Sequence, residues 1–319
     1  MKRIGVLTSG GDAPGMNAAL RAAVRTGLSH DMEVYGIRHG YEGLLDGEID
    51  RMNWSSVGEI LHRGGTILRT ARSKRFMEPE WQDKAVKILE TFGIEGLVVI
   101  GGNGSFQGGL ALAERGISVM GVPGTIDNDL GYTDYTIGFD TAVNTVLDII
   151  SKIRDTSTSH ERATVIEVMG RHCGDIALHA GLGGGADGIL IPEIELDVKQ
   201  LCMDVLKGQN AGKGHSLIIK AEGVDITTDE LVKTLEDVTG RETRAVILGH
   251  IQRGGSPSQR DRMLASITAA KAVQLLYNDN SSKAVGVSGG ELVAYDLKEA
   301  LEMTRDFDRR LYDLAVTLS

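Results

Sequence analysis

Short apolar runs alternate along the chain with longer stretches in which apolar residues recur at helical spacing. Runs of this kind, bounded by glycine and polar residues, are typical of buried strands. They predict strands over 3–8, 33–37, 97–100, 118–122, 164–169, 188–191, 216–221, 245–249 and 284–287. Apolar residues from Ala142 to Ile153 follow one face of a helix, for which Asp140 is the predicted N-cap. Strands that alternate with helices predict βαβ units and mostly parallel sheets.

Length and composition are consistent with this pattern. A chain of 319 residues is long enough for two domains or one large α/β unit, and its 41% hydrophobic residues can fill buried cores. Because only 4% of the residues are aromatic, we expect cores built from aliphatic side chains. The two cysteines, Cys173 and Cys202, provide neither a disulfide framework nor metal-ligand spacing, which favours a reducing, cytoplasmic location.

The first residues and the overall charge argue against several classes of protein. The stretch MKRIGVLTSGG lacks the apolar segment and cleavage site of a signal peptide, and no apolar run approaches membrane-spanning length. The formal net charge of −10 argues against general nucleic-acid binding. An anionic small molecule remains compatible with this charge, because a local cluster of arginines can oppose the overall sign.

Loops that follow predicted strands carry the candidate chemistry, because ligands of open α/β sheets bind beyond the carboxyl ends of the strands. The loops SGGDAPGMN at 9–17 and GGNGS at 101–105 offer glycine backbone and a helix N-terminus to a phosphate. A tight turn would use glycine and asparagine equally well, so each loop alone leaves both interpretations open. No Gly-Lys-Ser/Thr follows the first strand, so its loop is not a P-loop. No GxGxxG fingerprint follows it either, which argues against a dehydrogenase.

A third loop, PGTIDNDL at 123–130, brings carboxylates to the end of a predicted strand. In an extended chain alternate side chains share a face, so we expect Thr125, Asp127 and Asp129 to point together. Two carboxylates and a hydroxyl in one place suit metal binding and general-base catalysis. The alternative is a turn rich in Asp and Asn that is held by bonds between side chains and backbone. The spacing favours the functional interpretation.

Arginines at predicted loop positions suggest that a phosphate is recognised. The set comprises Arg72, Arg162, Arg171, Arg244 and Arg253. Each alone is more simply explained as a surface charge, but several in an acidic protein indicate bidentate phosphate binding. His250 alone would be a structural histidine, whereas beside Arg253 and two glycines it becomes a candidate sugar or phosphate contact.

These motifs, in this order, resemble the bacterial ATP-dependent 6-phosphofructokinases over the whole chain. The matching stretches are LTSGGDAPGMN, GGTILRTAR, GGNGS, PGTIDND, IGFDTA, KIRDT, SHER, EVMGR, AEG and GHIQRGGSP. The resemblance implies two Rossmann-like three-layer α/β/α domains with mostly parallel sheets. It places the ATP-binding domain at 1–138 plus 254–303 and the fructose-6-phosphate-binding domain at 139–253 plus 304–319. The implied reaction moves the γ-phosphoryl group of ATP to the 1-hydroxyl of fructose 6-phosphate in glycolysis, with Mg²⁺ as cofactor.

The resemblance also implies a role for each matching residue. Those implied for ATP are Gly11, Tyr41, Arg72, Ser73, Gly102, Asn103, Gly104 and Ser105, with Tyr41 near the adenine. Asp127 is implied as the catalytic base, and Thr125, Asp129, Arg171 and Arg72 complete the transfer site. Those implied for fructose 6-phosphate are Thr125, Asp127, Arg162, Met169, Gly170, Arg171, Glu222, Arg244, His250 and Arg253. Arg162 and Arg244 would reach that substrate from a neighbouring subunit, which implies a homotetramer.

Positions 103, 104 and 124 bear on the phosphoryl donor and its metal. Diphosphate-dependent relatives carry Asp and Lys where this chain has Gly104 and Gly124, so these glycines favour ATP. Asn103 stands where the family has an aspartate that binds magnesium, which leaves Asn103 and Asp129 as the implied metal ligands. An active enzyme with a weaker hold on its metal is the leading interpretation. A catalytically impaired binding or regulatory subunit of the same fold is the alternative.

The family's effector site, which binds ADP or phosphoenolpyruvate between subunits, is only partly matched. Matching or near-matching positions are Arg21, Arg25, Arg154, Gly185, Asp187, Lys213, Gly214 and His215. Trp54 replaces a family arginine, Ala211 replaces a family lysine, and Asp187 replaces a family glutamate. Two positive charges are therefore missing from a site built for anions, and we expect weak control by effectors.

Overall fold

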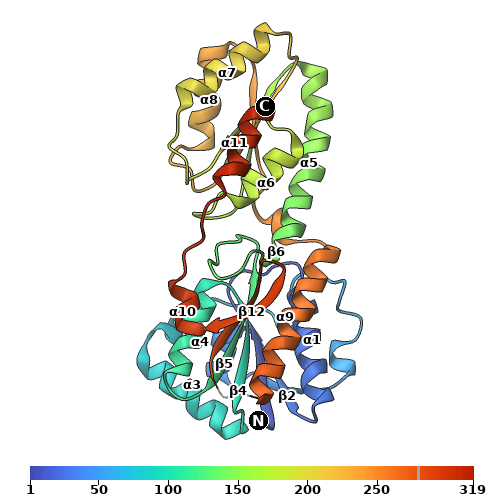
Figure 1. Cartoon of the computed structure of the whole chain (residues 1–319), viewed down its shortest axis with the longest axis vertical. Helices are drawn as coiled ribbons and strands as arrows, with labels where there is room; N and C mark the ends of the chain where they lie inside the picture. The colour runs from blue at the N-terminus through green and yellow to red at the C-terminus, as the bar shows by residue number, and fades with distance from the viewer. Residues whose placement is uncertain (279–280) are drawn as a thin grey trace. The chain divides into compact units, whose positions relative to one another are not determined.

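The computed structural model describes residues 1–278 and 281–319 and divides the chain into two compact units (Figure 1). Unit 1 comprises Met1–Thr141 and Arg253–Arg305, and unit 2 comprises Ala142–Gln252 and Asp306–Ser319. These limits lie within a few residues of the domain boundaries expected from the sequence. Which substrate each unit binds stays a prediction at this point.

Unit 1 is built on a mixed sheet of eight strands within the described residues, in the order β12-β11-β5-β4-β1-β2-β3, with β6 beside β5. The central strands run parallel, whereas β3 and β12 lie antiparallel to β2 and β11 at the two edges. The strands are β1 (Arg3–Thr8), β2 (Glu33–Ile37), β3 (Ile49–Met52), β4 (Gly96–Gly101), β5 (Ser118–Thr125), β6 (Ile137–Gly138), β11 (Lys283–Ser288) and β12 (Glu291–Asp296).

Helices cover both faces of this sheet, which explains why β4 is buried along its whole length (Figure 1). One face carries α1 (Met16–Ser29) and α9 (Gln259–Asn278). The other carries α2 (Gly40–Asp46), α3 (Pro79–Phe92), α4 (Asn103–Ala113) and α10 (Leu297–Glu302), and the short helices η1 (Ser55–Val57) and η2 (Arg75–Met77) belong to the same unit. Aliphatic side chains dominate the core against α3 and α4, with Phe106 as one of its few aromatic residues.

Unit 2 is a second three-layer unit, around a parallel sheet in the order β10-β7-β9-β8. Its strands are β7 (Ala163–Val168), β8 (Gly188–Leu190), β9 (Ser216–Ala221) and β10 (Thr243–Ile247). Helices α7 (Val198–Asn210) and α8 (Thr228–Thr239) pack on one face, and α6 (Asp175–Gly184), α5 (Phe139–His160) and α11 (Arg309–Leu318) lie on the other side (Figure 1). The expected fold class, α/β with mostly parallel sheets, is confirmed in both units.

Local differences from the sequence predictions have physical causes. Asp140 is not an N-cap, since α5 begins at Phe139 and Asp140 lies in its first turn. The carboxylate of Asp261, from α9, instead accepts hydrogen bonds from the backbone N–H groups of Gly138 and Thr141, each at 2.8 Å. The strand predicted over 245–249 begins and ends two residues earlier, because Gly249–Arg253 forms a short 3₁₀ helix (η3). Within the described residues, no helix is both long and apolar enough to span a bilayer.

Candidate active site

Three loops of unit 1 meet at one edge of its sheet because the strands that precede them are parallel neighbours. Residue Thr8 of β1 pairs with Ile100 of β4, and Gly101 of β4 pairs with Pro123 of β5. The backbone N–H of Ser9 donates to the carbonyl of Ile100 at 3.0 Å. A Cβ on Gly101 would lie 2.7 Å from the carbonyl oxygen of Ser9, so only glycine allows the first two loops to approach this closely.

The segment that carries Arg72 and Ser73 joins the first loop through Thr70. The hydroxyl of Thr70 donates to the carbonyl of Gly10 at 2.7 Å. Gly10 has a φ of 87°, in the left-handed region that favours glycine. The structure therefore brings the 70–73 segment to the same edge as the glycine loops, a link between distant residues that sequence spacing alone does not provide.

Arg253 also lies against the first loop. A Cβ on Gly11 would come within 2.2 Å of the Arg253 guanidinium, and that guanidinium donates to the carbonyl of Asp12 at 3.3 Å. Arg253 thus belongs to unit 1, although the expected boundary placed it with the sugar-binding domain. A contact between Arg253 and the sugar substrate stays a prediction.

The GGNGS loop ends in the N-terminus of α4, with Gly102 as the N-cap and Asn103 as the first helical residue. The first turn contains no acidic residue, so its N–H groups and the helix dipole favour an anion. The amide oxygen of Asn103 accepts a hydrogen bond from the side-chain amide of Gln107 at 3.1 Å. Gln107 lies one turn further along α4 and therefore competes for the one side-chain oxygen that Asn103 could offer to a cation.

Gly104 and Gly124, the two glycines expected to favour ATP as phosphoryl donor, differ in their surroundings. A Cβ on Gly104 would have no atom within 4 Å, so a longer side chain here would project into open space beside the start of α4. A Cβ on Gly124 would lie 3.0 Å from Ile100 and 3.3 Å from the backbone nitrogen of Gly101. Packing inside unit 1 already favours a small residue at 124, so Gly104 is the more informative of the two about the donor.

The third loop turns sooner than the alternation argument assumed. Strand β5 ends at Thr125, the chain bends, and Asn128 has a left-handed φ of 55°, so the extended geometry predicted through Asp129 is wrong. The side-chain oxygen of Asn128 accepts from the backbone N–H of Thr136 at 2.9 Å and so holds the turn. Thr125 and Asp127 remain close neighbours, since the backbone N–H of Asp127 donates to the Thr125 hydroxyl at 3.2 Å.

Asp127 and one oxygen of Asp129 are buried in this loop. Asp127 is only 1% exposed, and the Oδ1 atom of Asp129 is buried with no hydrogen-bond partner within residues 1–278 and 281–319. Burying a carboxylate oxygen without a hydrogen-bond donor costs free energy. A cation or a donor group on a substrate would satisfy the Asp129 oxygen, so this residue fits a role in metal binding.

Tyr41 lies in the core rather than on the surface of the GGNGS loop. Its side chain stacks on Phe76 with ring centroids 4.2 Å apart, and its hydroxyl donates to the carbonyl of Ser105 at 2.5 Å. Burial raises the pKa of Tyr41 well above its usual range, so the hydroxyl stays a donor. Tyr41 therefore supports the GGNGS loop from the core side. Its contact with adenine stays a prediction.

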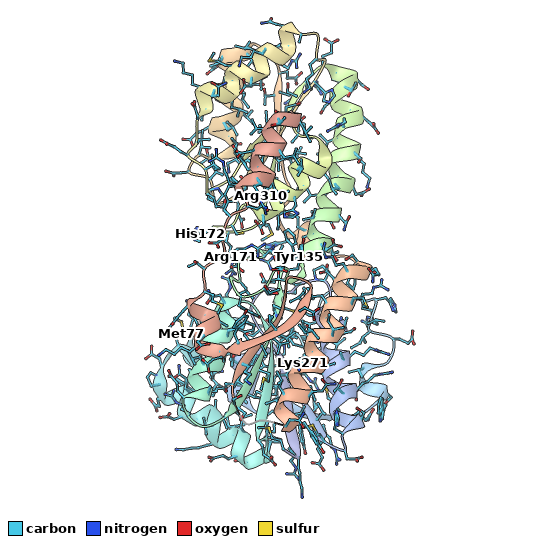
Figure 2. The ribbon with its side chains drawn as sticks, viewed as in Figure 1. Met77, Tyr135, Arg171, His172, Lys271 and Arg310 are labelled. Atoms are coloured by element: carbon cyan, nitrogen blue, oxygen red, sulfur yellow. The ribbon has the colours of Figure 1, made fainter. Side chains whose placement is uncertain are left out.

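Unit 2 presents its own candidate segment, Met169–Arg171, directly after β7. Gly170 and Arg171 have positive φ angles of 137° and 54°. One oxygen of the Glu222 carboxylate accepts from the backbone N–H groups of Gly170 at 3.2 Å and of Arg171 at 2.9 Å. Figure 2 shows Arg171 beside His172 on this loop. The carboxylate from the β9–α8 connection thus holds an unusual backbone conformation in place.

Two other arginines lie at the opposite end of the same strand. Arg162 precedes β7 and pairs with Glu242 at 2.7 Å, and Arg244 of β10 pairs with the same carboxylate. Its hydrogen bond to Arg162 lowers the pKa of Glu242, with Arg244 adding to the effect. A strand of six residues separates Arg162 from Met169, which corresponds to roughly 20 Å. Within one chain these arginines and the Met169–Arg171 segment cannot contact the same phosphate.

The family model for phosphofructokinase matches residues 3–276. The chain belongs to the phosphofructokinase family. It is 60% identical to the ATP-dependent 6-phosphofructokinase of Clostridium tetani over 319 residues, which is all of both chains.

Solved structures of phosphofructokinases share the fold. The phosphofructokinase of Saccharomyces cerevisiae matches with a TM-score of 0.90 at 34% identity, over 100% of this chain and 48% of the yeast chain. This chain therefore spans about half the length of the yeast protein. A pyrophosphate-dependent phosphofructokinase from Marinobacter aquaeolei matches with a TM-score of 0.87 at 22% identity, over 97% of this chain and 86% of that one. Since relatives named for different donors share the fold, the fold alone does not select the donor.

The residues expected at the phosphofructokinase effector site form one group in each unit. In unit 1, Arg21 and Arg25 lie on α1, and the Arg25 guanidinium lies 5.6 Å from the centre of the Trp54 ring. At this position, where the resemblance implies an arginine, Trp54 is 52% exposed and its ring contacts the Arg25 guanidinium.

The second group of effector-site residues lies in unit 2. The Asp187 carboxylate pairs with Lys213 and accepts from the backbone N–H of Leu217 at 2.6 Å. The Arg154 guanidinium donates to the carbonyl of Gly185 at 3.0 Å. Burial lowers the pKa of His215, and the nearby charges of Arg154, Lys213 and Arg241 add to the effect.

Arg241 was not anticipated from the sequence. Its guanidinium donates to the carbonyl of Lys213 at 3.0 Å, which brings a further positive charge to this group. The only signal along the chain is its place at the start of the stretch RETR, three positions before Arg244.

Proposed function

We propose that this chain is an ATP-dependent 6-phosphofructokinase, with unit 1 binding ATP and unit 2 binding fructose 6-phosphate. The observation that carries the proposal is the 60% identity, over the whole length, to a relative named for this activity. The glycine loops at the sheet edge of unit 1 and the arginine-bearing segment of unit 2 support it, because phosphoryl transfer asks mainly for positioning and charge stabilisation.

In unit 1 the nucleotide phosphates would lie over backbone N–H groups. Gly11 and the loop from Gly102 to Ser105 provide close backbone approach and the N-terminus of α4. Arg72 and Ser73, brought in by the Thr70 hydrogen bond, contribute a positive charge and a hydroxyl. Open space at Gly104 leaves room for a nucleotide at this helix end.

In the proposed phosphoryl transfer, Asp127 is the general base. The oxygen of the sugar 1-hydroxyl attacks the γ-phosphorus of ATP, the bond to the β,γ-bridging oxygen breaks, and ADP leaves with that electron pair. Asp127 accepts the hydroxyl proton, a role worth roughly 100- to 10,000-fold in rate. Its side chain is only 1% exposed, which limits the access of water to the base. Thr125 positions the base, and Arg171 and Arg72 offset negative charge on the moving group.

Mg²⁺ is the cofactor that this chemistry implies. When bound, it neutralises charge on the donor phosphates. Asp129 would hold it, since its buried Oδ1 has no hydrogen-bond partner within the described residues. Asn103 would be the second ligand, but it lacks a charge and its oxygen already accepts from Gln107. The residues therefore fit a magnesium ion that is held less firmly than one bound by two carboxylates.

The sugar phosphate would take residues from two copies of the chain. Met169, Gly170, Glu222 and His250 of one copy form one part of the proposed contact set, and Arg253 is a further proposed ligand. Arg162 and Arg244 lie at the other end of β7, roughly 20 Å away, so in this proposal a second copy presents them. This separation supports a homo-oligomer, which we propose to be the tetramer that the family resemblance implies.

A coupled assay of fructose 1,6-bisphosphate formation tests the proposal. ATP with Mg²⁺ should support turnover of fructose 6-phosphate, and pyrophosphate in place of ATP should not. Turnover with pyrophosphate alone would overturn the donor assignment, and no turnover with either donor would overturn the activity.

Subunit mixing tests the shared sugar site. Asp127→Ala and Arg162→Ala proteins should each be weakly active, because each lacks one residue of every site. Reassembled together, they should regain activity in sites that take Asp127 from one chain and Arg162 from another. A mixture no more active than its components would show that the sites are not shared.

A further inference from the structure

A lysine is buried in the sheet of unit 2 beside the segment proposed to bind the sugar. Lys220 of β9 is only 2% exposed, and its ammonium group lies 3.1 Å from Oε2 of Glu167 on β7. The two residues are direct partners in the parallel register of β7 and β9. A lysine is almost never buried this completely without a partner, so the position demands the ion pair.

A third side chain completes the network. The hydroxyl of Thr228, the first residue of α8, donates to the same Oε2 atom of Glu167. The residue before it, Thr227, is the N-cap of α8 and forms a capping box with Glu230. Thr227 therefore stabilises the helix end, whereas Thr228 links that end to β7, one of the two inner strands of the sheet.

The network lies at one end of a connection whose other end contacts the Met169–Arg171 segment. Residues 222–227 connect β9 to α8, and the Glu222 carboxylate at the start of this connection accepts from the N–H groups of Gly170 and Arg171. Gly223 lies so close that a Cβ there would be 2.0 Å from the carbonyl oxygen of Arg171. The connection is thus anchored at one end by Glu222 and at the other by Thr228.

The network also lines a cavity of about 480 Å³ between the connection and the strand ends. Lys220 is the one basic side chain on its wall among the described residues. The acidic residues on the same wall are Glu167, Glu222, Asp225, Asp229 and Glu230. Loss of the Lys220 charge would leave like charges facing one another across the cavity, and the connection would be pushed away from the sheet.

We propose that Lys220, Glu167 and Thr228 are positioning residues that hold Glu222, and through it Met169–Arg171, in the geometry needed for the sugar substrate. The inference rests on the proposed function for the identity of that substrate. An ion pair with only a structural role would respond differently to substitution. Well-packed apolar residues can replace such a pair with little loss of stability. Apolar replacement of Lys220 and Glu167 would not preserve a positioning network, because it removes the hydrogen bond between Thr228 and Glu167.

Two neighbouring threonines provide a matched test. Thr228→Val removes the tie to Glu167 and keeps the side-chain shape, whereas Thr227→Val weakens the cap of α8 and leaves the tie intact. We expect Thr228→Val to raise the KM for fructose 6-phosphate roughly tenfold, equivalent to about 1.4 kcal/mol, and to leave the KM for ATP unchanged. Thr227→Val should leave both KM values unchanged, and Thr228→Ser, which retains the hydroxyl, should resemble the wild type.

Amide hydrogen exchange gives a readout that does not depend on catalysis. In the absence of substrates, exchange at residues 169–171 should be faster in Thr228→Val and in the double variant Lys220→Met, Glu167→Met than in the wild type or Thr227→Val. Equal exchange and equal KM values in Thr228→Val and wild type would overturn the inference, as would equal effects of the two valine variants.

The two proposals fail in different ways. Absence of turnover by the wild type with fructose 6-phosphate would overturn the proposed function, and the exchange comparison would still decide whether the network holds residues 169–171. Should the double variant not fold, the threonine pair alone gives the result.

Discussion

Replacement of Asn103 by aspartate probes the weakest feature of the proposed metal site. In Asn103 one side-chain oxygen is available, and it accepts from Gln107 at 3.1 Å. A carboxylate has two equivalent oxygens, so Asp at 103 could keep the Gln107 bond and direct the other oxygen to Mg²⁺. The substitution hardly changes the side-chain volume, and Asn103 is exposed, so we expect no steric penalty.

Three effects of Asn103→Asp can be separated by magnitude. Without ligands, a negative charge in the first turn of α4, which has no acidic residue, should add about 0.3–1 kcal/mol to the free energy of unfolding. With Mg²⁺ and ATP, the added ligand should raise kcat at least ~10-fold, which requires only about 1.4 kcal/mol of barrier lowering. Without Mg²⁺, the same charge should repel the triphosphate and weaken ATP binding.

A Mg²⁺ titration of kcat at saturating ATP and fructose 6-phosphate, with calorimetry of ATP binding in the presence and absence of Mg²⁺, measures these effects. Gln107→Leu is the control, because it releases the oxygen of Asn103 without adding charge. This variant should lower the Mg²⁺ midpoint by less than Asn103→Asp does. Equal kcat values and equal Mg²⁺ midpoints for Asn103→Asp and the wild type would refute the reasoning and leave residue 103 as a helix-turn residue only.

Three further predictions concern the base, the effector site and one histidine. Asp127→Asn should lower kcat at least ~100-fold and leave ATP affinity within a factor of about two, measured by steady-state kinetics and calorimetry, and a near-normal kcat would rule out Asp127 as the base. Phosphoenolpyruvate and ADP at millimolar concentrations should hardly change the rate, whereas Trp54→Arg with Ala211→Lys should restore a response; strong sigmoidal inhibition of the wild type would contradict this prediction. Because burial lowers the pKa of His215, its neutral form is favoured in the folded state. The stability from this residue is therefore present above the ordinary histidine pKa and is lost as the pH falls below it. Denaturant unfolding at pH 7.5 and 5.5 should show a smaller decrease in His215→Gln than in the wild type, and identical pH dependence would contradict the assignment.

The sequence by itself determined the fold class and the places where chemistry gathers. Apolar runs such as Leu97–Ile100 are buried in the structure as strands with both faces covered, and hydrophobic burial is a property that periodicity reports directly. Because the carboxyl ends of parallel strands share an edge, the glycine loops after β1 and β4 could be expected to meet. The edge strands β3 and β12 were missed, since one or both of their faces are partly exposed and carry no continuous apolar run.

Only the tertiary structure decided which side chains share a partner. Tyr41 and Ser105 are bonded although 64 positions separate them, and Arg253 reaches the loop of Asp12 across 241 positions. Lys220 offered no signal along the chain, because a lysine in an apolar run resembles a strand-end surface charge until the register places it opposite Glu167. Local pattern reflects burial and backbone preference, which neighbouring residues determine. Pairing between distant polar groups depends on strand register and loop path, which the packing of the whole unit determines.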